Sequence, residues 1–373
     1  MSRIAVVAAG GTGGHLFPAQ ALAEALIARG WRIVLASDDR VAGFADSFPA
    51  ELRIGLSART FRRGDPVGMA LAGIAIGRGV LQAHKAFKSI QPSVVVGFGG
   101  YPSVPALLAG VLGGLPTVIH EQNAVMGRAN RRLAPMVKTV ACAFPTLQKA
   151  SASVRERAVV VGNPIRPAIR DLYDAPYTPP EPDGPINLLI TGGSQGARFI
   201  SELLPEAVRK LPEPLRLRLR VQQQTRADVM DQARRVYADC LVQAEVAPFF
   251  RDMAVRLREA HLVVGRSGAG SVCEFAIAGK PAILIPLAVA LDDDQGQNAR
   301  LLAEAGGAEV AREHQLTVDT MANALEKLLS NPARLARMAA ASRSVARPDA
   351  AERLADVVEQ TAASTAPQRL TRA

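Results

Sequence analysis

The feature that most constrains this chain is an apolar segment that runs directly into a cluster of glycines, and it occurs twice. Segment 4–9 leads into GGTGGH at 10–15, and segment 186–191 leads into GGSQGA at 192–197. Glycines in such a turn let backbone amides approach a phosphate at the start of a helix. A strand and a glycine-rich turn at the start of each half predict two Rossmann-like domains that face each other.

A chain of 373 residues is too long for one ordinary core, which also favours two domains. A proline-dense stretch at 176–185 precedes the second glycine-rich segment. We predict an N-terminal domain at 1–163 and a C-terminal domain at 164–346, with a final helix within 347–373 that joins the first domain. The fold class is α/β, because short apolar runs alternate with helix-like stretches and so indicate doubly wound parallel sheets. The expected strands are 4–9, 32–36, 94–97, 117–120 and 139–143 in the first half, and 186–191, 217–221, 262–265 and 282–286 in the second.

Composition narrows the classes of partner. The formal net charge is +10, so the surface should attract anions such as phosphates, nucleic acid or acidic lipid headgroups. Nucleic acid is the less favoured of these, because aromatic residues make up only 4% of the chain. The three cysteines match no disulfide or zinc spacing, as expected in a reducing cytoplasm. The longest apolar stretch, 104–116, is broken by proline and glycine, so no membrane-spanning helix is predicted.

The turn 10–15 predicts a phosphate site but does not match the nicotinamide fingerprint, which needs glycine where this chain has Leu16. Asp38 and Asp39, after the second strand, keep a dehydrogenase as an alternative. A tight turn that binds no ligand is a second alternative, since glycine is common in the turns that follow strands. His15 is the candidate base, because a neutral imidazole can take a proton from a sugar hydroxyl near pH 7. A histidine at a helix start also serves as a cap or a packing residue.

In the first half, GFGGY at 97–101 and HEQN at 120–123 follow predicted strands. Open parallel sheets bind their ligands at the carboxyl ends of such strands. His120 with Glu121 is not a zinc motif, because no second histidine follows at the required spacing. Both segments are therefore candidates for ligand contact.

In the second half, RSGAGS at 266–271 follows a predicted strand and begins a helix that carries Glu274. This carboxylate could accept hydrogen bonds from ribose hydroxyls, or it could only complement the helix dipole. The acidic run 292–294 suggests magnesium, but adjacent side chains rarely converge on one ion, so a solvated loop is favoured and no metal is predicted. Gln295 and Asn298 suit sugar hydroxyls.

Taken in order, these segments resemble those of the MurG family, the bacterial peptidoglycan glycosyltransferases that add N-acetylglucosamine (GlcNAc) to lipid I. The resemblance covers nearly the whole chain, and seven segments in sequence make it specific although each alone is weak. The segments are 10–15 with Phe17-Pro18, 99–101, 120–123, GNPIR at 162–166, 192–197, 266–274, and 292–295 with Asn298-Ala299.

The resemblance implies a GT-B fold, in which two Rossmann-like doubly wound parallel-sheet domains face each other across a cleft. The C-terminal domain would hold UDP-GlcNAc and the N-terminal domain the acceptor. It implies inverting transfer of GlcNAc to the 4-hydroxyl of MurNAc-(pentapeptide)-pyrophosphoryl-undecaprenol (lipid I), forming lipid II, with His15 as the catalytic base and no required cofactor. The alternatives are another GT-B glycosyltransferase acting on a lipid or natural-product acceptor, and a non-catalytic nucleotide-sugar-binding subunit.

The resemblance also implies the site residues, position by position. The family usually has histidine where this chain has Asp294, so no contact is assigned to that residue. The residues implied for UDP-GlcNAc are Thr12, Gly13, Gly14, Asn123, Arg166, Ser194, Gln195, Phe250, Arg266, Ala269, Glu274 and Gln295. Those implied for the acceptor are Gly11, Thr12, Gly13, Gly14, Tyr101, Glu121 and Asn123.

A lipid-linked acceptor implies work at the membrane surface. One segment combines apolar with basic residues and a second adds a basic group, a combination suited to anionic headgroups. An ordinary core helix with a solvated basic face is the alternative for the first of them. We expect a peripheral protein at the cytoplasmic face of the bacterial inner membrane. Its expected partners are UDP-GlcNAc, lipid I, anionic lipids and other cell-wall synthesis proteins, but not nucleic acid. The residues of the two segments are Met69, Leu71, Ile74, Ile76, Arg78, Lys85 and Lys88, and then Arg128, Arg131, Arg132 and Lys138.

Overall fold

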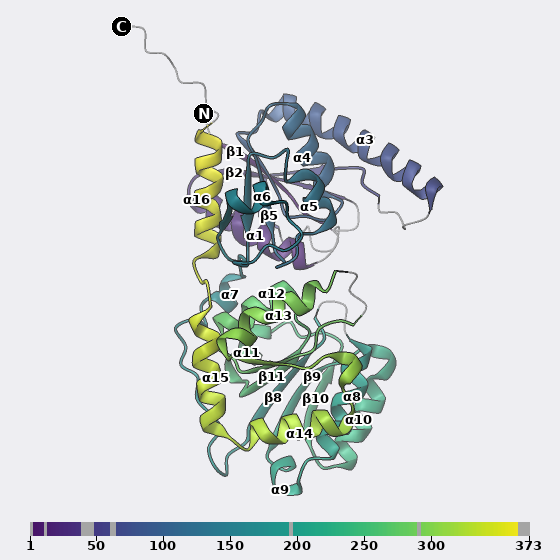
Figure 1. Ribbon diagram of the computed structural model, residues 1–373, viewed down its shortest axis with the longest axis vertical. Coiled ribbons are helices and arrows are strands. Elements are labelled where there is room, and N and C mark those ends of the chain that lie inside the picture. The colour runs from purple at the N-terminus through teal and green to yellow at the C-terminus, as the bar shows by residue number, and fades with distance from the viewer. Residues whose placement is uncertain are drawn as a thin grey trace. The chain divides into compact units, whose positions relative to one another are not determined.

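The computed structural model divides into two compact units (Figure 1). It describes residues 3–10, 13–38, 48–59, 65–193, 197–288 and 292–364. Unit 1 comprises Met1–Arg166 with Asp349–Ala373, and unit 2 comprises Pro167–Pro348. The predicted divisions, after 163 and after 346, lie within a few residues of these. The last helix falls in unit 1.

Unit 1 is built on a parallel sheet of seven strands in the order β3-β2-β1-β4-β5-β6-β7. The five strands predicted for the first half are confirmed as β1, β2, β4, β5 and β6. The edge strand β3 and the short β7 were not predicted. The bounds are β1 (Ile4–Ala8), β2 (Arg32–Ser37), β3 (Leu52–Gly55), β4 (Val94–Gly97), β5 (Thr117–Glu121), β6 (Thr139–Cys142) and β7 (Ala158–Val160).

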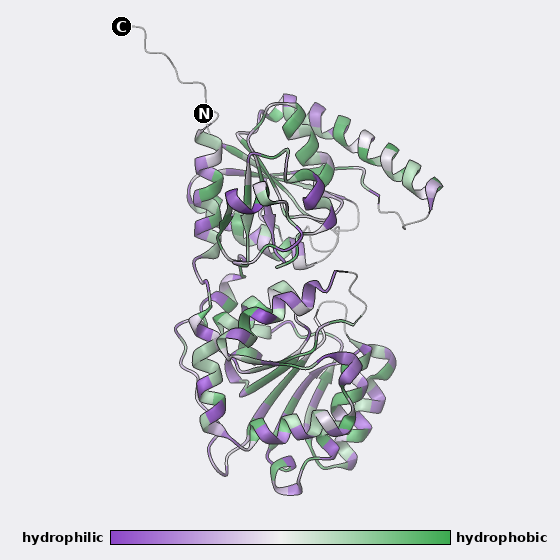
Figure 2. Ribbon diagram, in the orientation of Figure 1, coloured by the Kyte–Doolittle hydropathy of each residue, from purple (hydrophilic) through white to green (hydrophobic). Residues whose placement is uncertain are grey.

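Helices cover both faces of this sheet, so its central strands are apolar on both sides. Along β1, Ala5 and Val7 pack into one core layer, while Val6 and Ala8 pack into the other. Figure 2 shows hydrophobic residues gathered in the strands of both units. The helices are α1 (Gly13–Ala28), α3 (Pro66–Ile90), α4 (Ser103–Leu112), α5 (Arg128–Leu133), α6 (Ala152–Arg157) and α16 (Ala350–Ala363).

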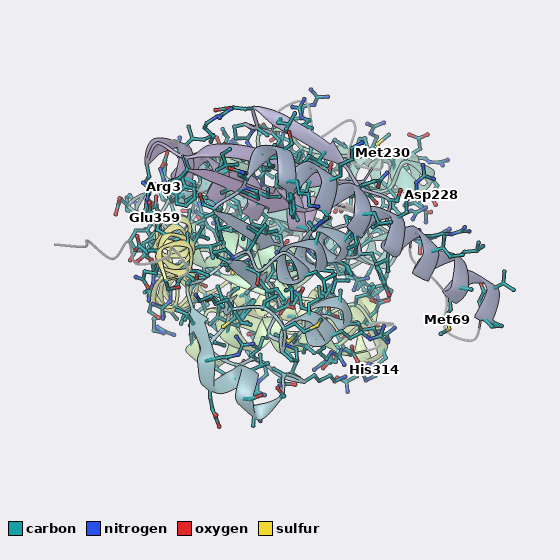
Figure 3. The ribbon with its side chains drawn as sticks, turned by 90° about the horizontal axis from the view of Figure 1, so that it is seen from above. Arg3, Met69, Asp228, Met230, His314 and Glu359 are labelled. Carbon is teal, nitrogen blue, oxygen red and sulfur yellow. The ribbon has the colours of Figure 1, made fainter. Side chains whose placement is uncertain are left out.

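Helix α16 closes the layer that contains α1, and its predicted start after Asp349 is confirmed. Arg29 donates to Glu359 at 2.9 Å, and the indole of Trp31 donates to the same carboxylate at 2.9 Å. Arg3 pairs with Glu359 at 3.0 Å, and the two side chains point toward each other in Figure 3. Together with the apolar face of the helix, these contacts anchor the end of the chain to its beginning.

Helix α3 is anchored at one end only. Asp65 caps it, with a carboxylate oxygen 2.8 Å from the amide of Gly68. Its second half packs on unit 1 at Gly79, where a Cβ would lie 2.3 Å from the carbonyl oxygen of Ser57. Its first half is largely exposed, and Figure 3 shows Met69 at the outer end. Among the described helices, α3 alone is long and apolar enough, by length and composition, to cross a membrane. The sequence had pointed instead to the stretch 104–116 as the longest apolar run.

Unit 2 repeats the design with six parallel strands in the order β10-β9-β8-β11-β12-β13. The four strands predicted for this half are confirmed as β8, β9, β11 and β12, with β9 ending three residues later than expected, at Gln224. The strands are β8 (Ile186–Thr191), β9 (Leu219–Gln224), β10 (Gln243–Ala247), β11 (Leu262–Gly265), β12 (Ala282–Leu284) and β13 (Ala308–Val310).

Several helices of unit 2 pack on its sheet in a large apolar cluster, to which Ile186, Leu188 and Ile190 of β8 contribute. The longer ones are α8 (Arg198–Arg209), α10 (Met230–Asp239), α12 (Ala269–Ile277), α13 (Asp294–Ala305), α14 (Val318–Leu329) and α15 (Pro332–Ser344). The shorter ones are α7 (Pro167–Arg170), α9 (Glu213–Arg216), η2 (Ala227–Val229), α11 (Met253–Glu259) and η3 (Glu313–Gln315).

Candidate active site

The strand order of unit 1 reverses between β1 and β4. Open parallel sheets bind ligands outside the carboxyl ends of strands at such a point, because the two loops leave in opposite directions. The loops after β1 and β4 approach closely here. A Cβ on Gly10 would lie 2.9 Å from Cγ of Pro102, and a Cβ on Gly100 would lie 3.6 Å from Nε2 of His15. Gly10 therefore has no room for a side chain, and His15 lies at the switch point.

His15 lies in the first turn of α1 and is half-buried. Its Nδ1 atom is 3.0 Å from Oε1 of Gln122, which follows β5. The other end of Gln122 donates from Nε2 to the carbonyl oxygen of Phe98 at 2.7 Å. The predicted base is thus held by side chain and backbone groups that follow two neighbouring strands. Among the described residues, Gln122 alone hydrogen-bonds the ring.

Glu121 is buried at the end of β5 and orders the loop that follows it. Its carboxylate accepts hydrogen bonds from the amide of Asn123 at 3.0 Å, the amide of Gly127 at 2.9 Å and Nδ2 of Asn130 at 2.8 Å. The side chain is 1% exposed. Glu121 therefore holds this loop, and its contact with the acceptor stays a prediction.

His120 is also internal. Its Nε2 donates to the carbonyl oxygen of Gly162 at 2.9 Å, which ties β5 to the segment after β7. Burial lowers the pKa of His120 to about 4, so the ring is neutral at physiological pH. His120 lies within β5 and is fully buried, whereas His15 is half-buried at the start of α1 and is accessible for proton transfer.

The other predicted residues of unit 1 are distributed around this edge. Gly13 is buried and Gly14 is exposed, while Tyr101 and Asn123 are half-buried. The predicted Gly11 and Thr12 lie outside the described residues. Arg166, at the end of the first stretch of unit 1, places its guanidinium 4.5 Å from the centre of the Phe17 ring.

In unit 2 the strand order reverses between β8 and β11. The glycine-rich turn leaves β8 with Gly193 at φ +75°, a conformation that favours glycine. Behind the turn, Nε2 of Gln224 donates to the carbonyl oxygens of Gly193 at 3.1 Å and of Pro248 at 3.3 Å. Its Oε1 accepts from Thr191 at 2.9 Å. Gln224 thus connects this turn with the loop that leads to Phe250. The predicted Ser194 and Gln195 lie outside the described residues.

The loop after β11 opens into α12, whose first residue is the predicted Ala269. A Cβ at Gly268 or at Gly270 would meet nothing within 4 Å, so space is open beside this helix N-terminus. The first amides of a helix lack partners within it and attract anions. Glu274 lies in the second turn of α12 and is half-buried.

Arg266 is held by protein groups. Its guanidinium donates to the carbonyl oxygen of Ile285 at 3.1 Å and to the carboxylate of Glu313 at 2.5 Å. The residue is 8% exposed. These contacts assign Arg266 to supporting the loop between β11 and α12, with its charge close behind the helix start.

The predicted Phe250 is buried, and the Arg256 guanidinium covers its ring at 3.7 Å from the centre. Arg256 is fixed in turn by Glu245, at 2.7 Å and 2.8 Å. The neighbouring Phe249 is 54% exposed. One face of the Phe250 ring is therefore covered by Arg256, and the contact of Phe250 with UDP-GlcNAc stays a prediction.

Helix α13 carries the remaining predicted residues. Oε1 of Gln295 accepts from the amide of Leu287 at 3.1 Å, and Nδ2 of Asn298 donates to the carbonyl oxygen of Ser267 at 3.3 Å. Asp293 pairs with Arg312 at 2.7 Å, so this carboxylate of the acidic run serves the protein itself. Within the described ranges, no group of three or more His, Cys, Asp or Glu side chains could hold a metal ion.

The predicted residues that the structure describes thus fall into two sets, one in each unit, and each set includes residues of the loops at that unit's switch point. Sequence analysis assigned no role to Gln122 or to the pair Thr191 and Gln224. Gln122 lies inside the HEQN segment, and its position after a strand was the available signal. Gln224 ends β9, the strand beside β8, and the glycine-rich turn follows β8. That position was the available signal for Gln224.

Comparison with known proteins agrees with this architecture. The glycosyltransferase family 28 N-terminal domain matches residues 5–142, and the family 28 C-terminal domain matches residues 187–354. A Phenylobacterium zucineum (strain HLK1) protein is 76% identical over 97% of this chain and 99% of its own length. It is named UDP-N-acetylglucosamine--N-acetylmuramyl-(pentapeptide) pyrophosphoryl-undecaprenol N-acetylglucosamine transferase. A protein of the same name from Caulobacter vibrioides (strain NA1000 / CB15N) is 63% identical over 97% of this chain and 100% of its own.

The crystal structure of MurG from Acinetobacter baumannii superposes with a TM-score of 0.77 at 30% identity, covering 96% of this chain and 99% of that one. Each of the two Rossmann-like units has its ligand edge at a switch point. Together with this match, they define a glycosyltransferase with the GT-B fold. The expected fold class is confirmed. The chain belongs to glycosyltransferase family 28.

Proposed function

We propose that this protein transfers GlcNAc from UDP-GlcNAc to the 4-hydroxyl of the N-acetylmuramic acid of lipid I, forming lipid II. The observation that carries the proposal is the 76% identity, over nearly the full length, to a relative named for this transfer. The two switch-point sites support it, because a transferase needs separate places for a donor and an acceptor. Unit 2 would bind the donor and unit 1 the acceptor.

In the proposed mechanism, Nε2 of His15 takes the proton of the acceptor hydroxyl. The hydroxyl oxygen then forms a bond to the anomeric carbon while the bond from that carbon to the UDP oxygen breaks, so the configuration inverts. UDP leaves with the bonding pair. The only hydrogen bond of His15 among the described residues goes to Nδ1, which supports Nε2 as the atom that accepts the proton.

We propose that backbone groups of unit 2 stabilise the charge of the leaving UDP, without a required metal. The open N-terminus of α12 beside Gly268 and the turn at Gly193 support this role. The buried guanidinium of Arg266, which is paired with Glu313, holds the loop that leads to this helix start. A chelator such as EDTA should then leave turnover within about twofold.

The direct test is transfer of label from UDP-GlcNAc to a short-chain lipid I analogue by the purified chain. A general base contributes about 10²–10⁴-fold, so His15→Ala should lower kcat by that factor while the Kd of UDP changes little. His314→Ala is the control for the loss of a histidine, because His314 is an exposed residue of unit 2 to which no role is assigned. No transfer by the wild-type chain would refute the function, and near-normal turnover of His15→Ala would refute the base.

We also propose that the protein binds the cytoplasmic face of the inner membrane peripherally, through α3 and anionic lipids. The outer half of α3 presents Val67, Met69 and Ile74, which are 68%, 50% and 69% exposed. The exposed Arg78 and Lys85 follow on the same helix. This exposure argues against an ordinary core helix. The packing of its second half on unit 1 favours a helix that lies on the membrane over one that spans it.

Vesicle sedimentation tests this proposal. Burying an isoleucine contributes about 1.5–3 kcal/mol, so Ile74→Glu should weaken binding to phosphatidylglycerol-containing vesicles by about tenfold or more. Leu217→Glu in unit 2 is the matched control, because Leu217 is also exposed at 54%. Equal binding to neutral and anionic vesicles, or equal loss in both variants, would contradict the proposal.

A further inference from the structure

We propose that Gln122 is a positioning residue that holds His15 in the tautomer with the proton on Nδ1, which leaves Nε2 as the proton acceptor. The inference rests on the proposed role of His15 in transfer. It is carried by the chain of contacts from the carbonyl of Phe98 through the Gln122 amide to the imidazole ring.

The orientation of the Gln122 amide is fixed by chemistry. A backbone carbonyl oxygen can only accept a hydrogen bond, so the group 2.7 Å from the oxygen of Phe98 must be the amide nitrogen. The opposite orientation would place two oxygens in contact. The Oε1 atom therefore faces His15.

The tautomer of His15 follows from this orientation. Oε1 has no proton to donate, so Nδ1 of His15, 3.0 Å away, must be the donor. A neutral imidazole carries one proton, and with that proton on Nδ1 the lone pair is on Nε2. The opposite tautomer would set the lone pair of Nδ1 against the lone pairs of Oε1.

The anchor of this arrangement is buried. Phe98 is 0% exposed and Gln122 is 3% exposed, so water cannot easily replace either hydrogen bond. Glu121 holds the loop that follows Gln122 through the amides of Asn123 and Gly127. The position of Gln122 is thus constrained from the strand on one side and from the loop on the other.

The neutral amide also differs from a carboxylate in its effect on the base. A carboxylate beside Nδ1 would fix the same tautomer but would raise the pKa of the ring. The amide selects the tautomer without placing a negative charge beside the ring. This difference separates two variants at the same position.

The first measurement is ¹⁵N NMR of the histidine rings in the full chain, without substrate, at a pH where the rings are neutral. The chain has five histidines, and the His15 signals are identified by their loss in His15→Asn. We expect protonated Nδ1 and unprotonated Nε2 in the wild type. In Gln122→Met, which keeps the length but removes both hydrogen bonds, the proton should move in part to Nε2.

Kinetics of the same variants give the second measurement. Gln122→Met should lower kcat at least tenfold with the KM for UDP-GlcNAc within twofold. Gln122→Glu should keep the Nδ1 proton and recover turnover while its carboxyl group is protonated, because the acid can donate to the carbonyl of Phe98 and accept from His15. Turnover relative to wild type should fall as pH rises, because the carboxylate has no proton to donate to that carbonyl.

Three outcomes would overturn the proposal: a wild-type ring with its proton on Nε2, unchanged kcat in Gln122→Met, or no recovery in a folded Gln122→Glu. Thermal unfolding of each variant separates loss of the fold from loss of positioning. A wild-type chain that shows the Nδ1 proton but transfers no GlcNAc would refute the proposed function and leave the role of Gln122 in place.

Discussion

Replacing Gln224 with leucine should weaken UDP binding while unit 2 remains folded. The amide of Gln224 connects three parts of the predicted donor site through Thr191, Gly193 and the carbonyl of Pro248. Leucine has nearly the same volume but makes none of these hydrogen bonds. The glycine-rich turn and the loop before Phe250 would then lose the group that holds them at a fixed separation.

The size of the effect follows from the three hydrogen bonds. Each neutral hydrogen bond contributes about 0.5–1.5 kcal/mol net, so their loss costs unit 2 about 1.5–4.5 kcal/mol. Part of this appears as lower stability and part as the free energy needed to order the two loops around UDP. If about 1–2 kcal/mol falls on binding, the Kd of UDP rises roughly 5- to 30-fold.

Calorimetric titration with UDP measures this change, and Gln223→Leu is the matched control. Gln223 is the preceding residue of β9 and is equally buried. Its Nε2 donates to the carbonyl oxygen of Ser201, and its Oε1 accepts from Tyr237, so its contacts face α8 and α10. Gln223→Leu should lower the unfolding temperature with little change in Kd. Equal Kd values in wild type and Gln224→Leu, or equal losses in both variants, would refute the reasoning.

Two further predictions concern unit 1. The pKa of Glu359 is lowered by the hydrogen bond from Trp31, and further by Arg29 and Arg3. A lowered pKa stabilises the fold above the unfolded value of about 4.3 and ceases to do so as pH falls through the folded value. Thermal unfolding should therefore show Glu359→Gln to be less stable than wild type at pH 7, and this gap should narrow as pH falls below about 4; a constant gap would contradict this. In Glu121→Gln, an NH₂ group replaces one of the two oxygens that accept hydrogen bonds from the loop. The loss of that acceptor should lower the free energy of unfolding by about 1–3 kcal/mol. Hydrogen exchange of the segment 123–130 should rise, and unchanged protection would argue against the loop-holding role.

Much of the fold follows from local pattern. The central strands, such as Val94–Gly97, are apolar throughout because helices cover both faces, and each was predicted. The missed strands lie at or near sheet edges, where that pattern is lost. Gln243–Ala247 reads QAEVA and pairs with one neighbour only, and Ala308–Val310 has three residues. Such segments become strands because a neighbouring strand offers them hydrogen bonds. The local sequence pattern does not reveal that neighbour.

The site was predictable in place but only partly in detail. Glycine-rich turns after the first strand of each half indicated both switch points. The roles of single polar side chains depend on which groups the fold brings beside them. Gln222, Gln223 and Gln224 are consecutive and identical in sequence, yet one is half-buried, one faces two helices and one joins two loops. Glu121 likewise contacts its own loop, which the resemblance could not indicate.

The return of α16 to unit 1 has a consequence for synthesis on the ribosome. Leu354, Val357 and Val358 of α16 belong to the same core layer as β1 and α1, so this layer is incomplete until α16 has emerged. All of unit 2 is synthesised first, which takes on the order of ten seconds. The second unit of the chain can therefore be the first to complete its core. A nascent chain truncated before Asp349 should expose an apolar face of unit 1 to chaperones, whereas release of the full chain covers it.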